Sequence, residues 1–129
     1  MSSTSQRILI IEDASLVRLY YRDIIGRAGF EIEEALNGLE ALEKLMMRPA
    51  DLLIVDINMP KVDGLTFLRT LRSQPLPIAS IPALMISTEA APADIAAARA
   101  AGANFYLVKP VPPDILLRYV TLLCGPKPA

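Results

Sequence analysis

Five short apolar runs rich in Ile, Val and Leu alternate along the chain with longer stretches of helical periodicity. This alternation is typical of repeated strand–helix units built around a parallel sheet. We predict five strands, at Arg7–Glu12, Phe30–Ala35, Asp51–Asp56, Ile81–Ser87 and Asn104–Val108. The sequence therefore indicates an α/β fold with five strands and five helices.

Local signals at the helix ends agree with this alternation. The expected helix starts are Ser15, Asn37, Asp63, Pro92 and Pro112. Asn37 and Glu40 have the spacing of a capping box, in which side chains bond to free backbone N–H groups. We expect the first helix to end at about Ala28 before Gly29, and the fourth to end at Gly102. The fifth is expected to reach about Cys124.

Helical periodicity also predicts which side chains pack against the sheet. The expected inward positions are Val17, Tyr20 or Tyr21, Ile24 and Ala28 in the first helix, Leu42, Leu45 and Met46 in the second, and Leu65, Leu68 and Leu71 in the third. In the second strand, Phe30 and Ile32 alternate with glutamates, so one face of this strand is expected to be wet. That pattern places the second strand at an edge of the sheet.

The chain has 129 residues, the size of one ordinary domain. We expect this domain at 7–124, between a disordered tail at 1–6 and a second tail at 125–129. Although 53% of the residues are hydrophobic, no run approaches the ~18 apolar residues that a membrane helix needs. A polar N-terminus and a single cysteine, Cys124, predict a cytoplasmic location.

The charged residues restrict the possible partners and chemistry. The chain has thirteen Lys and Arg residues against fourteen Asp and Glu, and the basic residues are scattered singly, which argues against direct binding to nucleic acid. The chain has no histidine. Metal ligands must therefore come from carboxylates and carbonyls, which favour a hard cation.

Polar residues stand where four of the predicted strands end: Glu12-Asp13, Asp56, Ser87-Thr88 and Lys109-Pro110. In an open parallel sheet, ligands gather at the carboxyl ends of the strands. Two carboxylates ~4 Å apart repel by about 4 kcal/mol at an effective dielectric of 20. Three of them need more positive charge than Lys109 supplies, and Mg²⁺ with oxygen ligands would supply it. The pattern therefore indicates metal-assisted phosphoryl transfer, with Asp56 as nucleophile and Lys109 and the Ser87 hydroxyl neutralising phosphoryl charge.

Taken together, Glu12-Asp13, DINMPKVDG at 56–64, STE at 87–89 and FYLVKP at 105–110 resemble the receiver domain of two-component response regulators. The match spans about Arg7 to Cys124 and is closest to stand-alone receivers of the chemotaxis type. The resemblance implies a doubly wound, flavodoxin-like sheet with strand order 2-1-3-4-5. It also implies that Asp56 accepts a phosphoryl group from a phosphohistidine on a histidine kinase or phosphotransfer protein.

The resemblance also implies roles for individual residues. Asp13, Asp56 and the backbone carbonyl of Asn58 would ligate Mg²⁺, and Glu12 would reach the ion through water. Lys109 would contact the phosphoryl group, and the Lys109-Pro110 peptide bond is expected to be cis.

The family's switch falls on Ser87 and Tyr106: the hydroxyl moves toward the phosphoryl oxygens and the aromatic ring turns inward. Asn58 and Glu89 resemble positions that tune the lifetime of the aspartyl phosphate. The sequence departs from the family's usual residues at two positions, and both departures are modest. Ser87 replaces the frequent threonine, and Val111 stands where an aromatic is common.

The C-terminal third also suggests an interaction surface. Ile95 is the only large apolar residue in the helix at 93–101, while the helix at 112–124 carries two apolar stripes. We expect these two helices and the strand Asn104–Val108 to contact a downstream protein or a second copy of the chain. The chain would then act as a phosphorylation-dependent switch or relay with only self-phosphorylation and slow self-dephosphorylation, not as an enzyme.

Rival interpretations remain open at this point. A small Mg²⁺-dependent phosphatase of the haloacid-dehalogenase type also uses an aspartate nucleophile, but Asn58 cannot act as the acid that such enzymes usually carry there. A degenerate receiver used only for interaction and a flavodoxin-like nucleotide binder are weaker alternatives. Individual residues also have simpler interpretations: Thr88 as a helix cap, Tyr106 as half-buried packing, Cys124 as inert, and Glu31, Glu33 and Glu34 as a solvated edge.

Overall fold

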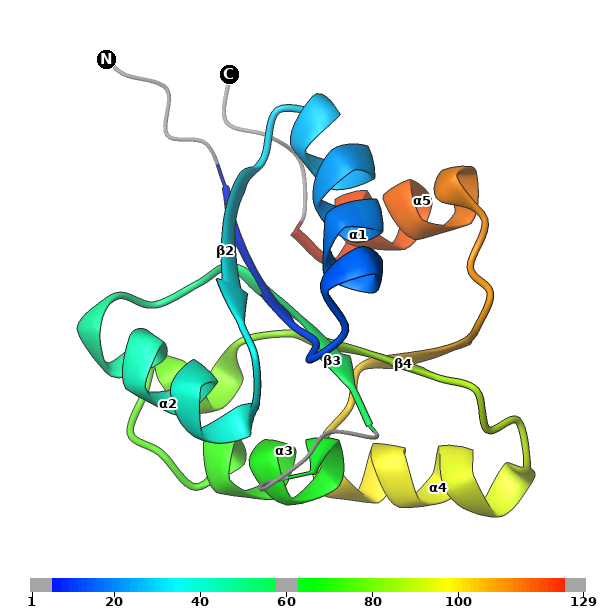
Figure 1. Cartoon of the computed structure of the whole chain (residues 1–129). Coiled ribbons are helices and arrows are strands. Elements are labelled where there is room, and N and C mark those ends of the chain that lie inside the picture. The colour runs from blue at the N-terminus through cyan, green and yellow to red at the C-terminus, as the bar shows by residue number, and fades with distance from the viewer. Residues whose placement is uncertain (1–5, 58–62, 125–129) are drawn as a thin grey trace.

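The computed structural model describes residues 6–57 and 63–124 (Figure 1). All five predicted strands are present, and each lies within two residues of its expected bounds. They are β1 (Arg7–Ile11), β2 (Glu31–Ala35), β3 (Leu52–Asp56), β4 (Ala83–Ser87) and β5 (Phe105–Val108). All pair in parallel, in the order β2-β1-β3-β4-β5. The predicted fold and the edge position of β2 are therefore confirmed.

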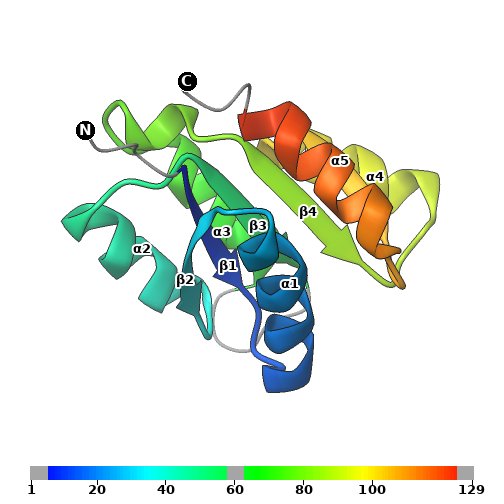
Figure 2. The same ribbon diagram turned by 90° about the horizontal axis from the view of Figure 1, so that it is seen from above.

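Four α-helices connect the strands and a fifth follows β5: α1 (Ser15–Arg27), α2 (Gly38–Met47), α3 (Gly64–Arg72), α4 (Pro92–Ala101) and α5 (Pro113–Cys124). A short 3₁₀ helix that the sequence did not predict, η1 (Ile78–Ser80), precedes β4. Helices α1 and α5 cover one face of the sheet, and α2, α3 and α4 cover the other (Figures 1 and 2). Within the described ranges, no helix combines the length and apolar character needed to cross a membrane.

The sheet separates two apolar clusters, because successive side chains of a strand point to opposite faces. In β1, Leu9 and Ile11 pack with α2, α3 and α4, whereas Ile8 and Ile10 pack with α1 and α5. All residues of β1, β3 and β4 are buried. A central parallel strand therefore presents no water-facing side, and only its end is free to carry chemistry.

The predicted helix caps are present. Oδ1 of Asn37 accepts a hydrogen bond from the Glu40 N–H at 2.9 Å, and Oδ1 of Asp63 accepts one from the Thr66 N–H at 2.8 Å. The Glu40 carboxylate returns to the N–H of Leu36 instead of Asn37. Gly29 and Gly102 both have positive φ, as helix C-termini that end in glycine require.

Two helix positions differ from the prediction, Met46 and Phe67, and one alternative that was left open is decided. Met46 is 64% exposed, because the buried stripe of α2 passes through Gly38, Ala41 and Leu45. In α3, Phe67 is fully buried although it was not predicted, while Leu65 is only partly buried. In α1, where the pattern left two tyrosines open, Tyr21 is buried.

The sequence suggested that Glu31, Glu33 and Glu34 form a solvated edge. The structure corrects this interpretation, because these glutamates of β2 form ion pairs. Arg7 is 5% exposed, and its guanidinium lies 2.7 Å from Glu33 and 3.6 Å from Glu31. Glu34 pairs with Arg18 and Arg22 of α1. These ion pairs attach the edge strand to β1 and to α1.

The predicted tails lie mostly outside the described residues. Gln6, which was assigned to the N-terminal tail, donates a hydrogen bond from Nε2 to the carbonyl of Cys124 at 2.6 Å. The first strand and the last helix therefore meet at the end of the sheet opposite the polar strand ends.

Candidate functional site

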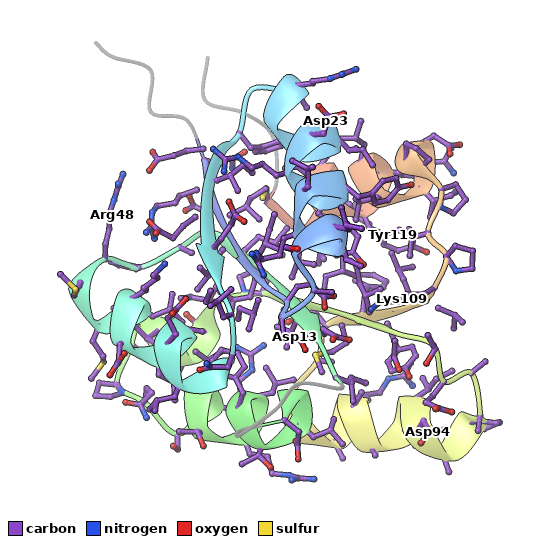
Figure 3. All side chains as sticks on the ribbon, in the orientation of Figure 1. Asp13, Asp23, Arg48, Asp94, Lys109 and Tyr119 are labelled. Carbon is purple, nitrogen blue, oxygen red and sulfur yellow. The ribbon has the colours of Figure 1, made fainter. Side chains whose placement is uncertain are left out.

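The carboxyl ends of β1, β3, β4 and β5 bring the predicted polar residues to one edge of the sheet. Ile11 pairs with Val55, so Glu12 and Asp56 stand at the same level on neighbouring strands. Asp56 pairs with Ile86, which places Ser87 one residue further along. In Figure 3, Asp13 and Lys109 lie near the same ends of the strands.

Three carboxylates gather at this edge. Oxygen atoms of Glu12, Asp13 and Asp56 all lie within 4.8 Å of one another. Glu12 and Asp56 are 1% and 6% exposed, whereas Asp13 is open to solvent. Burial and the negative charge of Asp56 raise the pKa of the Glu12 carboxyl to about 7. The cluster therefore carries more negative charge than its surroundings stabilise.

Lys109 supplies part of the missing positive charge. Its Nζ lies 3.3 Å from Oε1 of Glu12 and 3.4 Å from Oδ1 of Asp56. The residue follows β5, and its backbone N–H donates to the carbonyl of Ser87 at 2.7 Å. The predicted cis peptide bond between Lys109 and Pro110 is present.

The donor set suits a small divalent cation. One ammonium cannot balance three carboxylates, and oxygen ligands around a partly open position are what Mg²⁺ prefers. Glu12, Asp13 and Asp56 therefore fit the predicted metal site. Asn58, whose carbonyl was predicted as a further ligand, lies outside the described residues.

Ser87 and Tyr106 belong to a second group beside the acids. The Ser87 side chain is fully buried, and its Oγ accepts a hydrogen bond from the Glu89 N–H at 3.1 Å. The Tyr106 hydroxyl donates to the carbonyl of Glu89 at 2.7 Å, and its ring packs against the cluster under α3 and α4. Glu89 thus connects the two predicted switch residues through its backbone. Thr88 does not cap α4, because that helix begins after Ala91.

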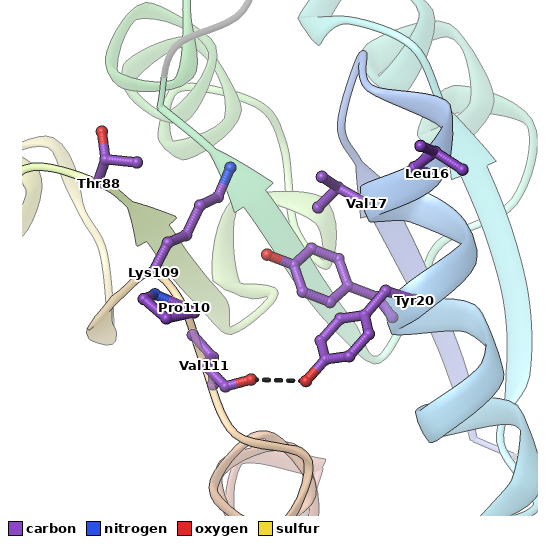
Figure 4. Close-up of a pocket in the computed structure, with 8 residues that line it drawn as sticks. Leu16, Val17, Tyr20, Thr88, Lys109, Pro110 and Val111 are labelled. Carbon is purple, nitrogen blue, oxygen red and sulfur yellow. Dashed lines mark hydrogen bonds between the residues drawn. The ribbon is translucent and has the colours of Figure 1, made fainter.

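An apolar groove of about 450 Å³ opens between α1 and the segment after β5 (Figure 4). It is lined by Leu16, Val17, Tyr20, Tyr21, Thr88, Lys109, Pro110 and Val111. Because Lys109 also contacts the acids, the groove and the acidic cluster share one wall. The hydroxyl of Tyr20 donates to the carbonyl of Val111 at 2.9 Å, across the groove.

A family model described as the response regulator receiver domain matches residues 8–121. The chain belongs to this family. The receiver domain is 36% identical over 121 residues to "Chemotaxis protein CheY1" of Helicobacter pylori, covering 92% of this chain and 97% of that protein.

Solved structures agree with the family assignment. Chemotaxis protein CheY4 of Vibrio cholerae superposes with a TM-score of 0.87 at 32% identity, over 93% of this chain and 99% of that one. The signal receiver domain of a signal transduction histidine kinase from Syntrophus aciditrophicus gives 0.86 at 30%, over 93% and 90%.

The family assignment decides between the interpretations left open by the sequence. The chain is a phosphoacceptor signalling switch, and the haloacid-dehalogenase-type phosphatase finds no support. Receiver domains generally bind Mg²⁺ at an acidic pocket, and Glu12, Asp13 and Asp56 form an acidic cluster of this kind. Receiver domains also interact with histidine kinases and downstream effectors.

Sequence reasoning did not find every residue at the receiver site. Tyr20 was considered only as a core position, yet it lines the groove beside Lys109. No local motif marks it. The only available signal was the proline-rich segment at 110–113, which has a single backbone N–H group, so its carbonyls need donors from elsewhere in the fold.

Proposed function

We propose that this receiver domain accepts a phosphoryl group on Asp56 from the phosphohistidine of a histidine kinase or phosphotransfer protein. The observation that carries the proposal is the position of Asp56. Its carboxylate is buried at a strand end, beside two further carboxylates and 3.4 Å from an ammonium group. A rigid strand end of this kind holds a nucleophile in place before its partner arrives.

Each residue has a defined part in the transfer. An oxygen of Asp56 forms the new bond to phosphorus while the phosphorus–nitrogen bond of the donor breaks and the imidazole leaves with the electron pair. Lys109 neutralises charge on the phosphoryl oxygens. Glu12 and Asp13, with Asp56, would hold Mg²⁺, which when bound balances the negative charge of the phosphoryl group.

Ser87 and Tyr106 would convert phosphorylation into a change of surface. The Ser87 Oγ, now an acceptor from the Glu89 N–H, would turn to donate to a phosphoryl oxygen. The Tyr106 hydroxyl, which now bonds to the Glu89 carbonyl, would leave that position as its ring turns inward. Hydrolysis of the aspartyl phosphate by water would end the signal, at a rate tuned by Asn58 and Glu89. No other catalytic turnover is proposed.

The surface that responds would be the α4-β5-α5 face, read by a downstream protein or by a second copy. Phe105 and Val108 on β5 and Leu122 on α5 are each exposed by more than a third. The Phe105 ring contacts the Tyr119 ring edge to face, with centroids 5.1 Å apart. This contact joins β5 to α5, so a movement of β5 would also displace α5. A cytoplasmic location stays a prediction from composition.

The direct test is to incubate the protein with Mg²⁺ and a small phosphoryl donor and to follow intact mass. We expect one acid-stable, base-labile phosphoryl adduct on the wild type and none on Asp56→Asn. Ser73→Ala, at the end of α3 and away from the acids, is the matched control and should still be phosphorylated. An equal adduct on Asp56→Asn would contradict the proposal.

A further inference from the structure

The segment that carries Lys109 is short of backbone donors. Residues 110, 112 and 113 are prolines, so Val111 has the only backbone N–H group between Lys109 and Asp114. The carbonyls of the segment still need hydrogen-bond partners. The Pro112 carbonyl obtains one from the Leu116 N–H at the start of α5. The neighbouring carbonyl, that of Val111, obtains one from a side chain of α1.

That side chain is Tyr20, which lies 91 residues away in the sequence. Its hydroxyl donates to the Val111 carbonyl at 2.9 Å (Figure 4). The Tyr20 ring lies with its centroid 5.9 Å from that of Tyr21, which is itself buried. The Tyr20 side chain thus extends from α1 across the groove, and its hydroxyl reaches the segment that follows Lys109.

The loop around Lys109 is therefore fixed on two sides. On one side, the Lys109 N–H bonds to the Ser87 carbonyl of β4 at 2.7 Å. On the other, the Val111 side chain is buried and its carbonyl is bonded to Tyr20. Between these points the Lys109 ammonium lies 3.3 and 3.4 Å from Glu12 and Asp56. These distances are longer than the ~2.8 Å of a strong charge-assisted bond, so the ammonium is held near the acids chiefly by the backbone that carries it.

We propose that Tyr20 is a positioning residue for phosphoryl transfer, whose hydroxyl fixes the segment that carries Lys109. The proposal rests on the proposed function, in which Lys109 neutralises phosphoryl charge at Asp56. The Tyr20 hydroxyl bonds to the carbonyl of Val111 and not to a carboxylate, so it would act through Lys109. Small displacements of a charge-stabilising group lower a rate more than they lower stability, because the electrostatic interaction is needed most in the transition state.

The test compares Tyr20→Phe, which keeps the ring and removes the donor, with Ser80→Ala, which removes a hydroxyl that donates to the Pro77 carbonyl at 2.9 Å. We expect Tyr20→Phe to slow phosphorylation of Asp56 by a small donor about tenfold, with the affinity for Mg²⁺ unchanged. Ser80→Ala is expected to react like the wild type. Amide hydrogen exchange at Lys109 and Val111 is expected to quicken in Tyr20→Phe, and exchange in β1 and β3 to stay unchanged.

A double-mutant cycle with Lys109→Gln separates positioning from a general structural effect. If Tyr20 acts through Lys109, Tyr20→Phe slows the reaction in the wild-type background and adds nothing in the Lys109→Gln background. An equal slowing in both backgrounds, or unchanged exchange at Lys109 and Val111, would overturn the positioning role. If the wild type takes up no phosphoryl group on Asp56, the proposed function fails, and the catalytic part of this proposal fails with it. A wild type that reacts while Tyr20→Phe matches it refutes the positioning role alone.

Discussion

The Nζ atom of Lys109 lies 3.4 Å from Oδ1 of Asp56, although 53 residues separate the two in the sequence. The same Nζ lies 3.3 Å from Oε1 of Glu12. One cation therefore serves two buried carboxylates that neighbouring strands bring to the same level.

Replacing Lys109 should have opposite effects on transfer and on metal binding. Lys109→Gln removes charge stabilisation of the phosphoryl oxygens, so we expect phosphorylation of Asp56 to slow roughly 100-fold. It also removes a positive charge beside the cation site, so Mg²⁺ should bind more tightly. Intact mass over time and calorimetric titration measure the two effects. Lys44→Gln, which removes another ion-paired lysine, is the control, and weaker Mg²⁺ binding in Lys109→Gln would contradict the assignment.

The raised pKa of Glu12 predicts a pH-dependent stability without divalent cations. The unfolded chain releases this proton near the ordinary pKa of 4.5, while the folded protein keeps it until about 7. The folded state therefore loses stability as pH rises through this window, by at most about 3 kcal/mol. In chelator, Glu12→Gln should match the wild type below the window and exceed it above.

The measurement is denaturant unfolding of both proteins across this pH range, with chelator and then with Mg²⁺. Added Mg²⁺ should remove the advantage of Glu12→Gln, because a cation stabilises the ionised carboxylate. If the wild type instead gains stability relative to Glu12→Gln as pH rises in chelator, burial and Asp56 do not raise the pKa of Glu12.

Gly64 should be irreplaceable for a steric reason. A Cβ atom at this position would lie 2.6 Å from the carbonyl oxygen of Asp56 and 2.7 Å from Cα of Ile57. These are backbone atoms at the end of β3, so Gly64→Ala should push α3 away from the site. We expect a loss of about 1–3 kcal/mol in unfolding free energy and slower phosphorylation of Asp56.

Gly26 in α1 offers the matched control. A Cβ there would meet nothing within 4 Å, and alanine favours helix over glycine by about 0.5–1 kcal/mol. Gly26→Ala should therefore stabilise the protein and leave the phosphorylation rate unchanged. Equal unfolding free energies for the two alanine variants would contradict the close approach of α3 to β3.

Activation should break the hydrogen bond from the Tyr106 hydroxyl to the Glu89 carbonyl. We expect a fluorine-labelled Tyr106 to change its NMR shift when Mg²⁺ and a beryllofluoride phosphoryl mimic are added, because its ring turns inward. Asp56→Asn, which cannot hold the mimic, should show no change. An unaltered Tyr106 signal in the wild type would place the switch elsewhere.

The sequence predicted most of the fold because the signals were local. The continuous apolar runs of β1 and β3 and the alternation in β2 each determine a strand's place in the sheet. Errors arose where one helical position decides burial: Met46 lies next to Leu45, yet 100° of rotation turns its side chain into solvent.

The site was predictable only in part. Glu12, Asp56 and Lys109 could be placed together because strand ends meet at one edge of a parallel sheet. Interactions between residues far apart were not visible in the sequence. Arg7 binding the glutamates of β2 and Tyr20 bonding to Val111 both depend on how distant elements pack.

Locating the phosphoryl group tests the central claim most directly. After reaction with a small donor and Mg²⁺, borohydride reduction converts an aspartyl phosphate into homoserine, which peptide mass spectrometry can locate. We predict homoserine at position 56 and at no other acidic residue. Homoserine at position 12 or 13, or its absence from position 56, would contradict the account.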